Sequence, residues 1–192
     1  MRGTARFTPE DVEVGHRDIL VVMTAIRQQF RGRIAGVGST SGTRVVVGRW
    51  EDTPLGTFGD AMVETASGHR VLLAPHQDAA DFIAATYTFD EVRIEPFAVT
   101  DPWQVRSPSL TLDLSIDART PLGRALRAVP RPVAVSPAWC TFTDPIARVV
   151  MRGVRTRGTA GNGRVEYYGA RRSRRIGAAT GTVRRDGLDG CV

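Results

Sequence analysis

The segment from Leu110 to Asp117, LTLDLSID, alternates apolar and polar residues without a break. Because successive side chains of a β-strand point to opposite faces of its sheet, this pattern predicts a strand with one buried face and one face open to water or to a ligand. Other short runs rich in valine and isoleucine are separated by residues that favour turns. The chain is therefore expected to fold around a sheet.

Two β-hairpins are predicted in the first half of the chain, each with a turn rich in serine and glycine. They join residues 34–37 to 44–47 and residues 60–65 to 69–74. The residues Val92, Ile94, Phe97 and Val99 fit a further extended segment, with an irregularity at Pro96.

Helical spacing is seen in two other regions. Near the N-terminus, Thr8 and Pro9 are typical of a helix start, and Ile19, Val22 and Phe30 recur at helical spacing, which predicts an amphipathic helix. A second helix is predicted over residues 78–87, and prolines divide residues 120–153 into short helical turns.

The last quarter of the chain carries the positive charge. Residues 148–192 contain 11 arginines and 3 acidic residues, whereas residues 1–147 contain 15 arginines and 17 acidic residues. Residues 164–170 and 174–183 are predicted to pair as a hairpin, preceded by a glycine-rich turn. A neutral body with a cationic end is typical of a protein that binds nucleic acid or an acidic protein, and the alternative is an ordinary solvated face of a basic sheet. The residues predicted to contact an anion are Arg164, Arg171, Arg172, Arg174 and Arg175.

These patterns predict one α+β domain over residues 1–192, rich in β-structure, with a mostly antiparallel curved sheet or incomplete barrel and helices packed on it. It comprises an N-terminal helical segment (1–32), an α+β body (33–153) and a basic hairpin region (154–192). The apolar run Ile19–Met23 is too short to span a membrane, and no signal-peptide pattern opens the chain, so a cytoplasmic location is expected. Two explanations remain for the final residues, GLDGCV: a sheet completed by a second copy in a homo-oligomer, or a truncated reading frame.

Several chemistries lack the residues that they need. All basic residues are arginine, so no lysine is present for an imine intermediate or for a phosphate-binding loop. The cysteines Cys140 and Cys191 are not in a metal-binding or redox spacing, and no metal or cofactor is predicted. The histidines also lack such spacing; a cluster of His69, His76, Asp78 and Asp81 is the alternative to surface positions.

The segment Trp50–Asp60, WEDTPLGTFGD, combines an aromatic residue, three acids and several turn formers. Binding loops that carry a carboxylate often have this composition, and the alternative is a polar connection with Trp50 packed beneath it. The predicted ligand-binding residues are Arg49, Trp50, Glu51 and Asp60.

The sequences TPLGTFGDAMVE and APHQDAADFIAATYTFDEVRIEPF resemble the central part of acetoacetate-decarboxylase-like proteins, over about residues 50 to 117. The resemblance implies strands and an alanine-rich helix beside a hydrophobic cavity, with Asp60 as an acid in the cavity strand. In that family the imine-forming lysine follows the helix, where this chain has Tyr87–Glu91. Decarboxylation through a lysine imine is therefore excluded.

Two functional hypotheses follow. The first is a protein that binds a small apolar organic acid or ketone in a β-lined cavity. The second is a binding module for an anionic partner, through the arginine-rich C-terminal region. No catalytic residue is predicted, and the patterns leave open whether the protein is an enzyme.

Overall fold

The computed structural model describes residues 4–7, 16–23, 29–101, 103–119, 157–159 and 165–184, together with positions 129, 130, 133 and 136. The elements with bounds in this part are β1 Thr4–Phe7, β2 His16–Met23, β3 Gln29–Gly38, β4 Arg44–Asp52, β5 Phe58–Glu64, β6 Arg70–Ala74, α1 Gln77–Ala84, β7 Glu91–Ile94, β8 Ala98–Thr100, β9 Gln104–Arg106, β10 Leu110–Arg119, β11 Arg157–Thr159 and β12 Val165–Arg184.

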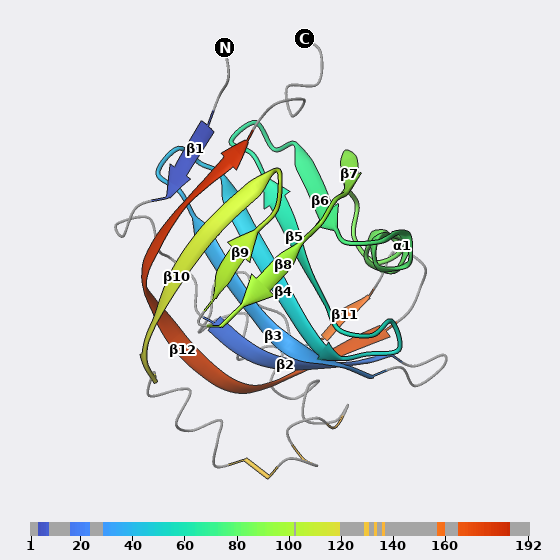
Figure 1. Ribbon diagram of the computed structural model, residues 1–192. Helices are drawn as coiled ribbons and strands as arrows, with labels where there is room; N and C mark the ends of the chain where they lie inside the picture. Colours follow the sequence, from blue (N-terminus) through green and yellow to red (C-terminus); the bar gives the residue numbers. More distant parts are fainter. Residues whose placement is uncertain are drawn as a thin grey trace.

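The strands form one sheet that is antiparallel except for the pair β6 and β7. Hydrogen-bonded neighbours follow the order β7-β6-β5-β4-β3-β2-β12-β10-β9-β8, and β1 and β11 both pair with β12. The sheet curls on itself (Figure 1), but its end strands β7 and β8 are not paired with each other in the described part of the chain, so it does not close into a barrel. The prediction of a mostly antiparallel, β-rich fold is confirmed.

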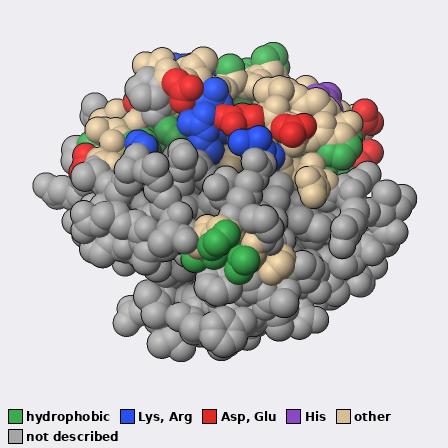
Figure 2. Space-filling model, turned by 90° about the horizontal axis from the view of Figure 1, so that it is seen from below, with side chains coloured by type: hydrophobic (Ala, Val, Ile, Leu, Met, Phe, Trp, Pro, Cys, Tyr) green, Lys and Arg blue, Asp and Glu red, His purple; other side chains and the backbone are tan. Residues whose placement is uncertain are grey.

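The curl encloses the main hydrophobic core, and we call the face of the sheet that lines this core the inner face. Strands β9, β10 and β12 lie across from β3 to β6 (Figure 1), and side chains from both groups pack together. In the view from below (Figure 2), basic and acidic side chains lie beside one another on the described surface. The core residues, at most 4% exposed, are Ala35, Val37, Val45, Val47, Ala61, Val63, Val71, Leu73, Trp103, Val105, Leu110, Leu112, Leu114, Ile176, Ala179 and Val183.

The predicted strands in the middle of the chain are confirmed. Strands β3 and β4 form the first hairpin, and β5 and β6 form the second. In β10, Leu110, Leu112 and Leu114 are buried while Thr111 and Ser115 are exposed, as the alternating pattern predicts. The chain breaks between β7 and β8, around Pro96, because proline cannot donate a hydrogen bond to a neighbouring strand.

The helix α1 packs on the opposite, outer face of the sheet and confirms the second predicted helix, although it is shorter than residues 78–87. His76 begins it, because its ring Nδ1 accepts a hydrogen bond from the Ala79 N–H at 3.2 Å. Helix residues Ala79, Ala80 and Ile83 form a second cluster with sheet residues Phe30, Phe58, Leu72 and Ala74. We call it the outer cluster.

The expectation of several packed helices is not supported, since α1 is the one helix whose bounds lie in the described residues. The helical turns predicted within residues 120–153 lie almost entirely outside them, as do Cys140 and Cys191. No helix in this part of the chain has the length and apolar character needed to cross a bilayer.

The predicted N-terminal helix is wrong. Residues 16–23 form β2, which pairs with β3 on one side and with β12 on the other, and Phe30 lies in β3. The run Ile19–Val22 is rich in β-branched residues, which favour strands, and a short apolar run fits either periodicity. Hydrogen bonding to strands on both sides decides the outcome.

The predicted C-terminal hairpin is also wrong. Residues 165–184 form one long strand, β12, so residues 164–170 and 174–183 do not pair with each other. The first part of β12 pairs with β2 and β11, and the second part pairs with β10 and β1. The arginine and serine residues between the two parts include no glycine to reverse the chain direction, so the strand continues. Its hairpin partner is instead β11, and the connecting residues 160–164 lie outside the described residues.

Candidate ligand-binding site

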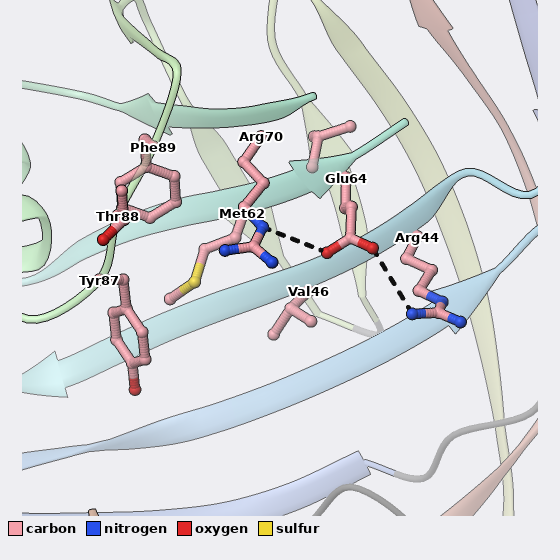
Figure 3. A pocket seen from close by; sticks show the side chains of 9 residues that line it. Arg44, Val46, Met62, Glu64, Arg70, Tyr87, Thr88 and Phe89 are labelled. Atoms are coloured by element: carbon pink, nitrogen blue, oxygen red, sulfur yellow. Dashed lines mark ion pairs between the residues drawn. The ribbon is translucent and has the colours of Figure 1, made fainter. Parts of the chain in front are cut away.

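An open groove of about 260 Å³ lies on the outer face of the sheet, beside the segment that follows α1 (Figure 3). Its floor is made by the apolar side chains Val46 of β4 and Met62 of β5, and Tyr87 and Phe89 stand beside them. The full lining is Arg44, Val46, Met62, Val63, Glu64, Arg70, Tyr87, Thr88 and Phe89.

A row of charged side chains forms one rim of the groove. Arg44, Glu64 and Arg70 are cross-strand neighbours on β4, β5 and β6. Arg44 Nη1 and Arg70 Nε each lie 3.5 Å from a different oxygen of the Glu64 carboxylate. Two guanidinium groups share one carboxylate, so the rim has an excess of one positive charge.

The groove exists because α1 is short. The helix covers Leu72 and Ala74, but it leaves Val46 38% exposed in the middle of the sheet. An exposed apolar floor beside charged groups is typical of a site that binds an amphipathic molecule.

A buried carboxylate lies directly next to the floor on the same face. In the hydrogen-bonded register, the pair Val46 and Met62 is followed by Gly48 and Asp60. The Asp60 side chain accepts a hydrogen bond of 2.6 Å from Trp50 Nε1 and is only 2% exposed. Gly48 provides the space for this contact, because a Cβ there would overlap Asp60 Oδ1 and would lie 2.6 Å from Trp50 Nε1.

The surroundings of Asp60 are aromatic. Phe30 meets Trp50 edge-on, with ring centres 6.1 Å apart, and stacks on Phe82 at 4.3 Å. Burial raises the pKa of Asp60 from 3.8 to about 6, although the Trp50 hydrogen bond acts in the opposite direction. Asp60 is therefore a buried carboxyl group on the same face of the sheet as the groove. It does not line the groove, so a ligand there would not contact it.

The four predicted ligand-binding residues do not form one site. Trp50 and Asp60 lie on the outer face, while Arg49 and Glu51 lie on the inner face with Arg33, because consecutive residues of a strand point to opposite faces. Residues 50–52 belong to β4 and residues 58–60 to β5, so the loop itself covers only residues 53–57. The expected single binding loop is thus divided between two surfaces.

The histidines are separated as well. His69 lies 3.5 Å from Glu91 and 3.9 Å from Asp90, whereas His76 caps α1 at the other end of β6. The alternative cluster of both histidines with Asp78 and Asp81 does not form. Among the described residues there is no group of three or more His, Cys, Asp or Glu side chains placed to hold a metal ion.

The predicted anion-binding arginines lie within the single strand β12 and not in two paired strands, except Arg164, which is outside the described residues. The backbone register places Arg172 opposite Asp18 and Arg174 opposite His16. Binding of a nucleic acid or an acidic protein there stays a prediction.

Sequence reasoning missed the groove residues Arg44, Val46, Met62, Glu64 and Arg70. One signal was present: in RVVVGRW both faces of the strand carry valine, so an apolar face beyond the main core needed a cover or a ligand. No protein-family model, no curated protein and no solved structure matches this chain.

Proposed function

We propose that the protein binds a small amphipathic molecule, an organic acid with a compact apolar body, in the outer-face groove. The apolar body rests on Val46 and Met62, and the acid group takes hydrogen bonds from Arg44 and Arg70. The observation that carries the proposal is an exposed valine in the centre of a sheet, next to two arginines that share one carboxylate.

The rim arginines favour an acid over a ketone as the ligand. A carboxylate offers the negative charge that the rim lacks, whereas a ketone offers only a neutral acceptor. The volume of about 260 Å³ limits the ligand to a small molecule. The proposal shares its ligand class with the resemblance to acetoacetate-decarboxylase-like proteins, but it involves no imine, since the chain has no lysine.

Binding of octanoate and phenylacetate, each compared with its neutral amide, tests this proposal by calorimetry. The acids are expected to bind about tenfold more tightly than the amides, since a charge-assisted hydrogen bond contributes more than a neutral one. Glu64→Gln is expected to strengthen binding, because it removes the carboxylate that competes for the two arginines.

Val46→Glu is expected to abolish binding, because it places a charge on the apolar floor. Val92→Glu is the matched control, since Val92 is a similarly exposed valine (44%) on β7 that does not line the groove. The proposal is wrong if neither acid binds, or if Val46→Glu binds the acids as tightly as Val92→Glu does.

A further inference from the structure

Two aromatic rings form a wall of the groove, and both come from the segment that follows α1. Tyr87 and Phe89 line the groove, and Figure 3 shows their rings beside the Met62 side chain of the floor. The Tyr87 side chain is 42% exposed, whereas Phe89 is partly buried and packs against the outer cluster. A ligand on the floor would therefore meet two rings and a thioether as well as the charged rim.

This wall is anchored at both ends by hydrogen bonds. The carbonyl of Ile83 in α1 accepts a hydrogen bond of 3.0 Å from the Tyr87 N–H. At the other end, the Asp90 N–H donates to the Arg70 carbonyl at 2.9 Å, and the Arg70 N–H donates to Asp90 Oδ2 at 2.8 Å. Arg70 also carries one of the two guanidiniums of the rim. The backbone that fixes the rings thus fixes part of the rim, and binding does not have to order a loop.

The residue types of the wall and the floor indicate the apolar body of the ligand. Two aromatic rings in an edge-to-face or offset arrangement attract each other more than their buried area alone accounts for. A methionine sulfur also makes a favourable contact with an aromatic ring. An aliphatic body would gain the burial of its surface but neither of these contacts.

We infer that the groove selects an aromatic carboxylic acid over an aliphatic acid of the same size, with Tyr87, Phe89 and Met62 as the residues that determine this specificity. The inference rests on the proposed function, because it concerns the apolar body of the acid that Arg44 and Arg70 would bind.

A comparison of phenylacetate with cyclohexylacetate by calorimetry tests the inference. The two acids have the same carboxylate and the same carbon skeleton, and they differ in whether the ring is aromatic. The saturated ring is the more hydrophobic of the two, so burial alone would favour cyclohexylacetate. We expect phenylacetate to bind about fivefold more tightly, because it alone gains the contacts with the rings and with the sulfur.

The double variant Tyr87→Leu, Met62→Leu is expected to bind the two acids equally. Both substitutions keep an apolar side chain, and leucine has a volume similar to that of methionine. Tyr87→Phe is the matched control, because it removes the hydroxyl and keeps the ring, and it is expected to retain the fivefold preference. Loss of the preference in Tyr87→Phe would assign it to the hydroxyl and overturn the role of the ring.

The outcomes separate this inference from the proposed function. Equal binding of the two acids by the natural protein, or tighter binding of cyclohexylacetate, overturns the inference and leaves the proposed function in place. Absence of binding by both acids overturns the two together. A preference that survives in the double variant also overturns the inference.

If the double variant does not fold, the natural protein decides. The ring current of phenylacetate should shift the NMR signal of the Met62 methyl group further than cyclohexylacetate does. A Met62 signal that responds equally to the two acids would overturn the inference.

Discussion

The two faces of strands β4 to β6 are covered in different ways. Val47 on the inner face is completely buried, whereas its neighbour Val46 on the outer face is 38% exposed. The inner face packs against side chains from β9, β10 and β12, whereas the eight residues of α1 cover only part of the outer face. The groove is therefore the apolar area that the short helix leaves uncovered.

The two faces also differ in whether their charged side chains are paired with an opposite charge. On the inner face, Arg33, Arg49, Glu51 and Asp101 form ion pairs at the edge of the core, in contact with solvent. On the outer face, Asp60 is buried, and its described hydrogen bond comes from a neutral indole. A buried carboxylate without a cation destabilises a fold. Burial of Asp60 therefore lowers the stability of the protein, whereas the charged side chains on the inner face are paired.

The largest expected effect comes from adding a side-chain carbon at Gly48, which lies against the contact between Trp50 and Asp60. Gly48→Ala is expected to lower the free energy of unfolding by about 3 kcal/mol, because its Cβ would overlap the Asp60 carboxylate and press on the indole. The measurement is chemical denaturation.

Gly38→Ala, in β3, is the control for that substitution. A Cβ at Gly38 would have no atom within 4 Å, so its effect is expected to stay within about 0.5 kcal/mol. Equal losses for the two variants would show that the outer face does not depend on the contact between Trp50 and Asp60.

The next effect concerns the charge of Asp60. Because its pKa in the folded protein is raised from 3.8 to about 6, the folded state holds the proton more tightly than the unfolded state does. The resulting stabilisation is complete below about pH 4 and is lost as the pH rises through about 6. The stability of Asp60→Asn relative to the natural protein is expected to increase by about 2.5 kcal/mol between pH 4 and pH 7.

Denaturation of both proteins across this pH range measures that difference. Trp50→Phe sharpens the test, since it removes the hydrogen bond that favours the charged carboxylate and should move the transition of the Asp60 group to higher pH. A stability difference that does not change with pH would contradict the role given to burial.

The smallest effect compares the adjacent valines directly. Val47→Ala is expected to lower the free energy of unfolding by about 2 kcal/mol, because it leaves a cavity in the inner core. Val46→Ala is expected to cost less than about 1 kcal/mol and to weaken binding of the acid ligand instead. If Val46→Ala destabilised the fold as much as Val47→Ala does, the groove floor would belong to the core rather than to a binding site.

The sequence predicted the elements whose signals are local. The alternation in Leu110–Asp117, the serine and glycine turns and the alanine-rich run of α1 all depend on neighbours in the chain, and each is confirmed. Residues 16–23 and β12 were misassigned because their apolar and basic runs fit more than one structure, and their partner strands come from distant parts of the chain.

The candidate sites were less predictable. The predicted site grouped Trp50 and Asp60, which lie in contact, with Arg49 and Glu51, which lie on the opposite face, because a linear segment does not show the two faces of a strand. Arg44, Glu64 and Arg70 become neighbours only through the register of β4, β5 and β6.

By itself, the sequence determined that no lysine chemistry is possible, that the middle of the chain forms strands, and that Val46 and Val47 point in opposite directions. Only the tertiary structure decided which of these two valines is covered, which charges pair and which carboxylate is buried. The physical reason is that periodicity depends on adjacent residues, whereas burial depends on where α1, β10 and β12 pack against the sheet.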